Sequence, residues 1–225
     1  MHIVIDGNIG SGKTTQLGLL EKKGWKVQRE PIDDWPLEEF YNDPKRWAFL
    51  FHMVILRTLQ PPEKTRTHVL LERSLMSSRH VFWPVLAKKG FVTPSEDETY
   101  SYFYDKNAWY PDLYIYLDKS PEKAFEHIQV RHQAGDSGVS LEYLKELDVE
   151  YKKLIHNVPC KVIIVDAERT AEEIHLEICR HLSENELFLC DSGRDKVPPQ
   201  GGRGRKVPRA PQAYMCRVSR GYETE

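Results

Sequence analysis

Residues 7–14 have the residue types and spacing of a phosphate-binding loop. Their sequence, Gly-Asn-Ile-Gly-Ser-Gly-Lys-Thr, fits the pattern G-x-x-x-x-G-K-T, and it follows an apolar predicted strand and opens a predicted helix. Glycines let backbone N–H groups close around phosphate oxygens, and a helix N-terminus adds partial positive charge. We expect Lys13 to reach the β- and γ-phosphates and Thr14 to bind Mg²⁺. The segment therefore predicts binding of a nucleoside triphosphate through Gly7, Asn8, Ile9, Gly10, Ser11, Gly12, Lys13, Thr14 and Thr15.

Two further predicted strands end in charged residues. Glu30 ends one of them, where it could accept a proton from a hydroxyl held near the γ-phosphate. Trp35, a little further along, offers an apolar wall for a flat ring. Glu72 and Arg73 end the other strand, and such a pair suits the Mg²⁺ side and the transition state of phosphoryl transfer. Taken alone, these residues are typical of a turn and of a surface ion pair. Their occurrence together beside a phosphate loop favours the catalytic interpretation.

Predicted strands and helices, which must position these groups, alternate along the chain. Short apolar runs predict strands over residues 2–6, 25–30, 67–73, 112–118 and 161–166. Helices are predicted over residues 13–23, 44–59, 75–89, 95–108, 121–131, 140–156 and 170–182. This alternation predicts an α/β fold of the P-loop NTPase type, a three-layer sandwich in which a five-stranded parallel sheet has helices on both faces. Binding groups should gather at the carboxyl ends of its strands.

The composition excludes several classes of protein. Of the 225 residues, 29% are charged and 40% are hydrophobic, and the net charge is −2, which gives no pull toward nucleic acid. No apolar run approaches the roughly 20 residues that a membrane-spanning helix needs. The 4 cysteines match no zinc-ligand spacing, so we expect reduced thiols. We therefore expect a small-molecule substrate, with no membrane association and no requirement for nucleic acid.

The end of the chain differs from the rest. Residues 186–225 are basic and rich in Gly and Pro, a composition that cannot bury a core, so we predict a disordered tail. Residues 1–185 are predicted to form the folded domain. A basic docking segment for nucleic acid or a protein partner is the alternative interpretation of the tail.

Four motifs resemble those of the deoxyribonucleoside kinase family, which includes thymidine kinase 2-like, deoxycytidine and deoxyguanosine kinases and relatives in large DNA viruses. They are GNIGSGKTT at 7–15, EPIDDW at 30–35, YNDPKRWAFLFH at 41–52 and ERSLMSSR at 72–79. A weaker likeness at 131–144 corresponds to the family's lid and the helix after it. The resemblance covers residues 1–182. It implies a helical lid and transfer of the γ-phosphate of ATP, with Mg²⁺, to the 5′-hydroxyl of a deoxynucleoside in nucleotide salvage.

The resemblance also implies catalytic roles by position. Glu30 would be the general base for the 5′-hydroxyl. Arg73 would hold the hydroxyl region and the transferring phosphoryl group, with Glu72 on the Mg²⁺ side. Arg131 matches a lid arginine that closes over the phosphates. The family lid carries several arginines, whereas this chain has His127 and Gln133 at the other two arginine positions, which implies a slower enzyme.

Further positions imply contacts with the nucleoside and with the adenine of ATP. Trp35 and Phe82 would sandwich the base, and Tyr41 would contact the sugar 3′-hydroxyl. Asp136 stands where the family has a Glu that shares this hydroxyl, and His52 stands where it usually has a Gln that pairs with the base edge. Histidine offers one donor and one acceptor at best, so His52 is either a base contact or a packed residue. The adenine would lie near Asp166.

An uncharged pair of residues predicts the nucleoside. Deoxycytidine-preferring members of the family carry an Arg and an Asp where this chain has Leu59 and Ser78. Leu59 and Ser78 resemble the thymidine-accepting members, because they leave room for a 5-methyl group and bury no unpaired charge. We therefore expect thymidine or a broad range of pyrimidine deoxynucleosides.

Two alternatives remain at this point. Thymidylate kinase shares the loop and the Glu-Pro motif, and a monophosphate acceptor could use Arg29, Arg46 or Arg57. A nucleotide-binding protein with little turnover would explain the altered lid and His52. The resemblance further implies a homodimer. Because the chain starts directly in a predicted strand, we expect no leader sequence and a cytoplasmic location, which is the host cytoplasm if the protein is viral.

Overall fold

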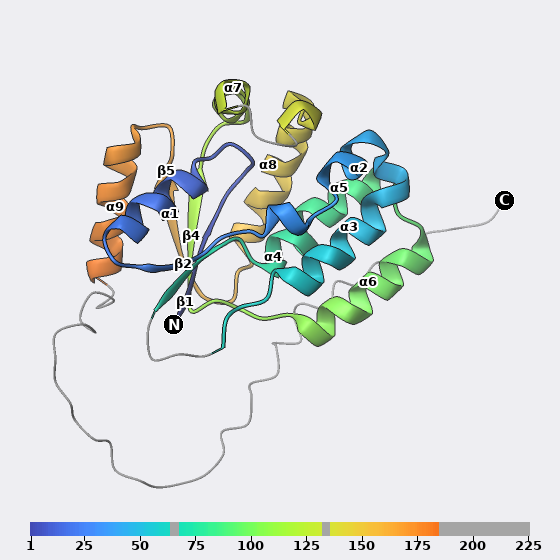
Figure 1. The fold of residues 1–225 in the computed structure, drawn as a ribbon, viewed down its shortest axis with the longest axis horizontal. Coiled ribbons are helices and arrows are strands. Elements are labelled where there is room, and N and C mark those ends of the chain that lie inside the picture. The colour runs from blue at the N-terminus through green and yellow to red at the C-terminus, as the bar shows by residue number, and fades with distance from the viewer. Residues whose placement is uncertain (64–67, 132–135, 185–225) are drawn as a thin grey trace, which may run out of the picture. The chain divides into compact units, whose positions relative to one another are not determined.

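A parallel sheet of five strands forms the centre of the fold (Figure 1). The computed structural model describes residues 1–63, 68–131 and 136–184, so the predicted tail lies outside the described residues. The strands are β1 (His2–Asp6), β2 (Lys26–Gln28), β3 (Val69–Glu72), β4 (Leu113–Asp118) and β5 (Lys161–Asp166). Their order is β2-β3-β1-β4-β5, and each neighbouring pair is parallel.

Helices cover both faces of the sheet, which confirms the predicted three-layer sandwich (Figure 1). One face carries α1 (Lys13–Lys22) and α9 (Ala171–Glu184), and the other carries α3 (Pro44–Thr58), α5 (Trp83–Lys88), α6 (Pro94–Asn107) and α8 (Leu141–Ile155). The central strand β1 serves both layers, because Ile3 and Ile5 pack in the α1–α9 cluster and Val4 packs in the cluster around α8. Alternate residues of a strand point to opposite faces, so a fully apolar strand fits a sheet that is covered twice.

Local sequence explains where several helices begin. Asp43 caps α3 by accepting a hydrogen bond from the backbone N–H of Arg46, and Ser140 caps α8 in the same way from Tyr143. Thr93 and Glu96 form a reciprocal capping box at the start of α6. The helix α7 (Pro121–Arg131) begins at a proline, which suits a first helical turn. It lies beyond the carboxyl ends of the strands (Figure 1).

The structure differs from the prediction beside the strand ends. β2 ends at Gln28, so Glu30 lies in the loop after it, and this loop holds a 3₁₀ turn, η1 (Ile32–Asp34), and the short helix α2 (Leu37–Asn42). The helix predicted over residues 75–89 is present, but it contains a π-helical turn. The segment consists of α4 (Leu75–Ser77), the π-helical turn η2 (Ser78–Phe82) and α5, and its backbone stays helical throughout. The π-helical turn has a physical cause, because Pro84 has no N–H to donate to the carbonyl of His80.

The remaining described element is a 3₁₀ turn, η3 (Asp136–Gly138), between α7 and α8. Together α7 and η3 make the described part of the predicted lid, whereas Gln133 lies outside the described residues. Within the described ranges, no helix combines the length and the apolar character needed to cross a lipid bilayer.

Candidate active site

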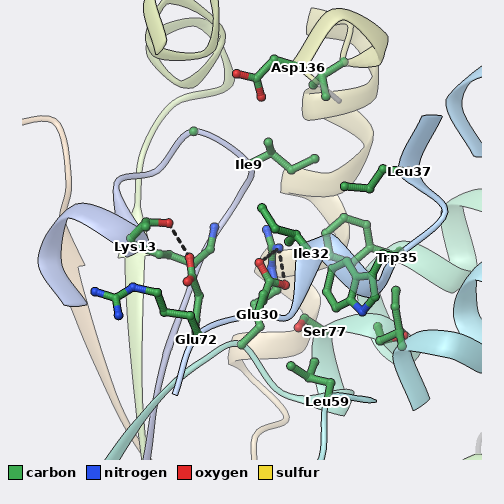
Figure 2. A pocket seen from close by; sticks show the side chains of 18 of the residues that line it. Ile9, Lys13, Glu30, Ile32, Trp35, Leu37, Leu59, Glu72, Ser77 and Asp136 are labelled. Carbon is green, nitrogen blue, oxygen red and sulfur yellow. Dashed lines mark hydrogen bonds and ion pairs between the residues drawn. The ribbon is translucent and has the colours of Figure 1, made fainter. Parts of the chain in front are cut away.

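A cavity of about 820 Å³ opens at the carboxyl ends of β1, β2 and β3. Its walls come from the phosphate loop, the loop after β2, helices α2 and α3, the segment after β3, and the lid. Figure 2 shows Glu30 in the middle of it, with Lys13 and Glu72 on one side and Trp35 on the other. Most of the predicted site residues line this cavity: Ile9, Gly10, Gly12, Lys13, Thr14, Thr15, Glu30, Trp35, Tyr41, Glu72, Arg73, Ser78, Phe82, Arg131 and Asp136.

The ammonium group of Lys13 is bound by backbone carbonyl groups of the phosphate loop. Its Nζ donates to the carbonyl oxygens of Gly7 at 3.0 Å and Asn8 at 2.9 Å. Burial, together with the positive charge of Arg73, lowers the pKa of Lys13 to about 7. Gly12 starts the following helix with φ of 97°, a left-handed conformation that glycine adopts without strain. The loop is therefore shaped around a cation that a phosphate group would stabilise.

Thr14 and Glu72 meet beside the loop. The Thr14 hydroxyl donates a 2.7 Å hydrogen bond to Oε1 of Glu72. Both groups offer oxygen, the ligand atom that Mg²⁺ requires. Among the described residues, no group of three or more His, Cys, Asp or Glu side chains could hold a metal ion by itself. Mg²⁺ in phosphoryl-transfer sites is bound by one or two protein oxygens, substrate phosphates and waters, so these two residues fit it.

Glu30 and Arg73 form a buried ion pair. Nη1 of Arg73 donates to both carboxylate oxygens of Glu30, at 2.8 and 2.9 Å. Burial raises the pKa of Glu30 and the charge of Glu72 adds to this, while Arg73 acts in the opposite direction. Burial alone would lower the pKa of Arg73, but Glu30 reverses this and holds it well above the usual value. The pair thus places the carboxylate of Glu30, whose pKa is raised, against the permanently charged guanidinium of Arg73 next to the phosphate loop.

The lid contributes a second arginine–carboxylate pair. Nε and Nη2 of Arg131 donate to the carboxylate of Asp136 at 3.0 and 2.8 Å. Tyr41 lies against this turn, and a Cβ atom added to Gly138 would come within 2.4 Å of its ring. Burial raises the pKa of Tyr41 to about 12, so its hydroxyl keeps its proton and can donate. The lid and α2 therefore bring Tyr41, Arg131 and Asp136 together, and their roles toward a sugar and toward phosphates stay predictions.

The far end of the cavity is apolar and suited to a flat ring. Trp35 is fixed by a 2.9 Å hydrogen bond from its indole N–H to the Thr58 hydroxyl, and Leu59 and Phe82 also line the cavity. Leu59 lies at the opposite end of the view from Asp136 (Figure 2). Three serines, Ser74, Ser77 and Ser78, bring hydroxyl groups to the cavity wall, and Ser78 is the predicted base contact.

His52 is not on the cavity wall. It is 1% exposed, and its Nδ1 shares a 2.9 Å hydrogen bond with the Ser78 hydroxyl, which shares another of 2.9 Å with the Tyr100 hydroxyl. Burial, together with the charge of Arg79, lowers the pKa of His52 to about 3, so the imidazole is neutral at physiological pH. The structure thus supports packing for His52 and gives it a direct contact with a cavity residue, Ser78.

A few predicted residues lie away from the cavity. Asn8 ties the loop to α8 by donating to the carbonyl of Leu144 at 2.9 Å, and Gly7 and Ser11 lie within the loop without lining the cavity. Asp166, at the end of β5, pairs with Arg169 at 3.6 Å in a separate hollow. A contact between Asp166 and adenine stays a prediction.

Sequence reasoning missed several residues of the site. Val139, Tyr143 and Leu37 line the cavity, and all three belong to segments whose apolar residues gave no chemical signal. Asp6 and Tyr151 contact Arg73 from behind the cavity. Asp6 carried a detectable signal, because a carboxylate at the end of an apolar strand, directly before a phosphate loop, must find buried partners.

Comparison with known proteins gives a consistent match. Residues 3–186 match the family model described as deoxynucleoside kinase. A protein of Invertebrate iridescent virus 3 that is named as a kinase is 34% identical over 186 residues, which cover 80% of this chain and 95% of that protein. Deoxyadenosine kinase of Dictyostelium discoideum is 29% identical over 192 residues, covering 78% of each chain.

Solved structures agree in fold. Deoxyadenosine kinase from M. mycoides, solved with the products dCMP and dCDP, superposes with a TM-score of 0.75 at 25% identity. The match covers 82% of this chain and 100% of that one. The same enzyme with bound dATP gives a TM-score of 0.73 at 25% identity.

Proposed function

The chain belongs to the deoxynucleoside kinase family and is an ATP-dependent phosphotransferase, and we propose that it prefers thymidine or a broad range of pyrimidine deoxynucleosides. The reaction joins the 5′-hydroxyl oxygen of the nucleoside to the γ-phosphorus of ATP. The bond from this phosphorus to the bridging β,γ oxygen breaks, ADP leaves, and the hydroxyl proton passes to a base. Catalysis of this kind consists mainly of positioning and charge stabilisation.

The Glu30–Arg73 pair is the observation that carries the proposed mechanism. Glu30 is buried beside the phosphate loop and its pKa is raised by burial, which brings it closer to the value that suits a general base. We infer that Glu30 accepts the proton of the 5′-hydroxyl while Arg73 holds the phosphoryl oxygens. Lys13 would bind the β- and γ-phosphates, and Arg131 would approach them from the lid.

The metal site of the proposed mechanism uses Thr14 and Glu72. Their contact of 2.7 Å brings a hydroxyl and a carboxylate to one point beside the phosphates, and oxygen ligands of this type fit Mg²⁺. The ion would neutralise charge on the triphosphate when bound. Glu72 and Thr14 would orient it, and Lys13 would add a second positive charge to the same phosphates.

The preference for a pyrimidine rests on the far end of the cavity. Leu59 and Ser78 introduce no charge there, so a thymine ring with its 5-methyl group leaves no charged group unpaired. Trp35 and Phe82 would lie on the two sides of the base. Because His52 is neutral and bonded to Ser78, we infer that it acts on the base through the orientation of the Ser78 hydroxyl.

The test is ADP release from ATP and Mg²⁺ with thymidine, deoxycytidine, deoxyadenosine, deoxyguanosine or thymidine monophosphate supplied separately. Turnover with thymidine, alone or with deoxycytidine, is the expected result. Turnover with a purine deoxynucleoside alone would contradict the interpretation of Leu59 and Ser78. The proposed acceptor hydroxyl would be contradicted if thymidine monophosphate were the one acceptor that supported turnover. It would also be contradicted if none of the five acceptors supported turnover.

We also propose that the enzyme forms a homodimer through α3 and α6. These helices pack on each other and expose large apolar side chains: Leu50 is 49% exposed, Tyr102 59% and Phe103 41%. Large exposed apolar side chains on two helices that pack together are a candidate for a protein interface. Light scattering should give a dimer mass for the wild type and a monomer mass for Tyr102→Glu. Leu176→Glu is the control, because Leu176 is 67% exposed on α9. A monomeric wild type would overturn the proposal.

A further inference from the structure

Three residues that do not line the cavity form a buried polar group directly behind Arg73. They are Asp6, Tyr114 and Tyr151, and each is fully buried. We propose that Asp6 and Tyr151 are positioning residues that hold the guanidinium of Arg73 in place for phosphoryl transfer, with Tyr114 only completing the hydrogen bonds of Asp6. This inference rests on the proposed roles of Glu30 and Arg73.

The Asp6 carboxylate is saturated by protein donors. Its Oδ1 accepts the backbone N–H of Gly7 at 2.8 Å and the Tyr151 hydroxyl at 2.9 Å, and its Oδ2 accepts the Tyr114 hydroxyl at 2.7 Å. Nε of Arg73 lies 3.5 Å from Oδ1. A buried carboxylate requires such partners. Because Asp6 has 0% exposure and does not line the cavity, it acts on the reaction through its neighbours and not by touching the substrate.

Tyr151 connects this carboxylate to Arg73. Its hydroxyl donates to Asp6 and accepts a 3.2 Å hydrogen bond from Nε of Arg73. Burial raises the pKa of Tyr151 well above its usual value, so the hydroxyl keeps the proton that it donates. A phenol has one donor and can accept as well. Tyr151 uses both capacities here, between a buried anion and a buried cation.

The contacts of Arg73 divide into an edge that is held by the protein interior and an edge that faces Glu30. Nε is bonded to Tyr151, Nη2 donates to the carbonyl of Gly7 at 3.3 Å, and the Phe82 ring lies 5.0 Å from the guanidinium carbon. Nη1 alone points at Glu30. When a hydroxyl enters between Glu30 and the phosphate, Glu30 must exchange part of its contact with Arg73. An arginine held along its other edge does not follow the carboxylate.

The same group also joins Arg73 to the phosphate loop. The Gly7 N–H donates to Asp6, while the Gly7 carbonyl accepts from both Lys13 at 3.0 Å and Arg73 at 3.3 Å. Arg73 has φ of 61°, and it is the one described non-glycine residue with positive φ, a conformation that needs support from its surroundings. Asp6 thus fixes the position of Arg73 relative to the first peptide group of the phosphate loop.

Two isosteric variants separate this role from general stability. Tyr151→Phe and Tyr114→Phe each remove one hydroxyl that donates to Asp6, but only Tyr151 touches Arg73. We expect Tyr151→Phe to lower kcat about tenfold, with KM for ATP within about twofold, because a hydrogen bond to a charged group is lost. Tyr114→Phe should keep kcat within about twofold of the wild type.

The pH profile gives a second readout that a purely structural effect would not move. Burial raises the pKa of Glu30, whereas Arg73 opposes this rise. A looser Arg73 opposes it less, so the acid limb of kcat against pH should move to higher pH in Tyr151→Phe. The limb should stay at its wild-type position in Tyr114→Phe, even if the melting temperature falls by the same amount in both variants.

Equal kcat values and equal acid limbs for the two variants would overturn the inference. If Tyr151→Phe does not fold, Asp6→Asn is measured in its place, since it keeps the side-chain shape and removes the charge beside Nε. Asp6→Asn is expected to lower kcat and to move the acid limb in the same direction. Failure of the proposed function would look different, because the wild type would then phosphorylate no deoxynucleoside, or Glu30→Gln would keep the wild-type kcat.

Discussion

The Thr14 hydroxyl donates a 2.7 Å hydrogen bond to Oε1 of Glu72. One residue opens the helix after the phosphate loop and the other ends β3, so the bond exists only because β1 and β3 are adjacent in the sheet, with Ile5 paired to Glu72. This adjacency is how the fold brings two oxygen ligands from distant parts of the sequence to one side of a triphosphate site.

The first prediction concerns this pair. Glu72→Gln keeps an oxygen that can accept from Thr14 but removes the charge. We expect it to raise the concentration of free Mg²⁺ that gives half-maximal activity by roughly tenfold, a typical loss for an altered metal site. Thr14→Ser retains the hydroxyl and is the matched control, with little change expected. Initial rates measured against free Mg²⁺ decide the matter, and an unchanged requirement in Glu72→Gln contradicts the assignment.

The second prediction concerns the base. Glu30→Gln preserves the shape of the side chain but cannot accept the proton, so kcat should fall by about 100-fold or more. The ATP dissociation constant should change by less than about twofold, because Glu30 contacts the acceptor side of the site. Calorimetric titration with ATP beside steady-state rates measures both effects. Lys13→Ala is the contrast, since it should damage both ATP binding and turnover. A Glu30→Gln enzyme with full kcat would exclude Glu30 as the base.

The phosphate loop, the charged residues that follow the strands and most of the residues that line the cavity could be predicted from the sequence, because each of those signals is local. Glu30, Glu72 and Arg73 follow strands whose apolar character places them at the same edge of a parallel sheet. The pairing of Glu30 with Arg73 and the hold of Tyr151 on Arg73 depend on where distant segments pack, and no spacing in the sequence encodes them. The π-helical turn at Ser78 has a partly readable cause in Pro84. The hydrogen bond between Ser78, at the start of this turn, and His52 of α3 depends on how the two helices pack.

The third prediction is an uptake of protons when ATP binds. The pKa of Lys13 in the free protein is lowered to about 7 by burial and by Arg73, so at pH 8 most molecules hold a neutral amine. Phosphate oxygens favour the ammonium form and raise this pKa, so the complex takes up a proton. The affinity for ATP should be nearly constant below pH 7 and fall above it, by up to about tenfold per pH unit.

Calorimetry in buffers of different ionisation enthalpy measures this uptake directly at pH 8. Lys13→Arg is the matched variant, because a guanidinium stays protonated throughout this range. It should bind ATP without taking up a proton, whatever its affinity. Equal heats for the wild type in all buffers at pH 8 would contradict a lowered pKa for Lys13.

The last prediction tests the contact between the lid and the sugar site. A methyl group at residue 138 would lie 2.4 Å from Cγ and 2.7 Å from Cβ of Tyr41. These atoms are close to the backbone of Tyr41, so the whole side chain must move. Gly138→Ala should therefore raise KM for the deoxynucleoside by roughly tenfold, with KM for ATP almost unchanged, as for a lost hydrogen bond and ring contact.

Gly18→Ala is the control for an added methyl group, because its nearest atom is Nη2 of Arg29 at 3.9 Å, an ordinary contact. It should leave both KM values unchanged. The coupling is tested by adding Gly138→Ala to Tyr41→Ala. Since the methyl group acts by displacing Tyr41, it should have no further effect once the ring is gone. A second rise in KM in the double variant would mean that Gly138 acts on the substrate by another route, through Asp136 in the same turn.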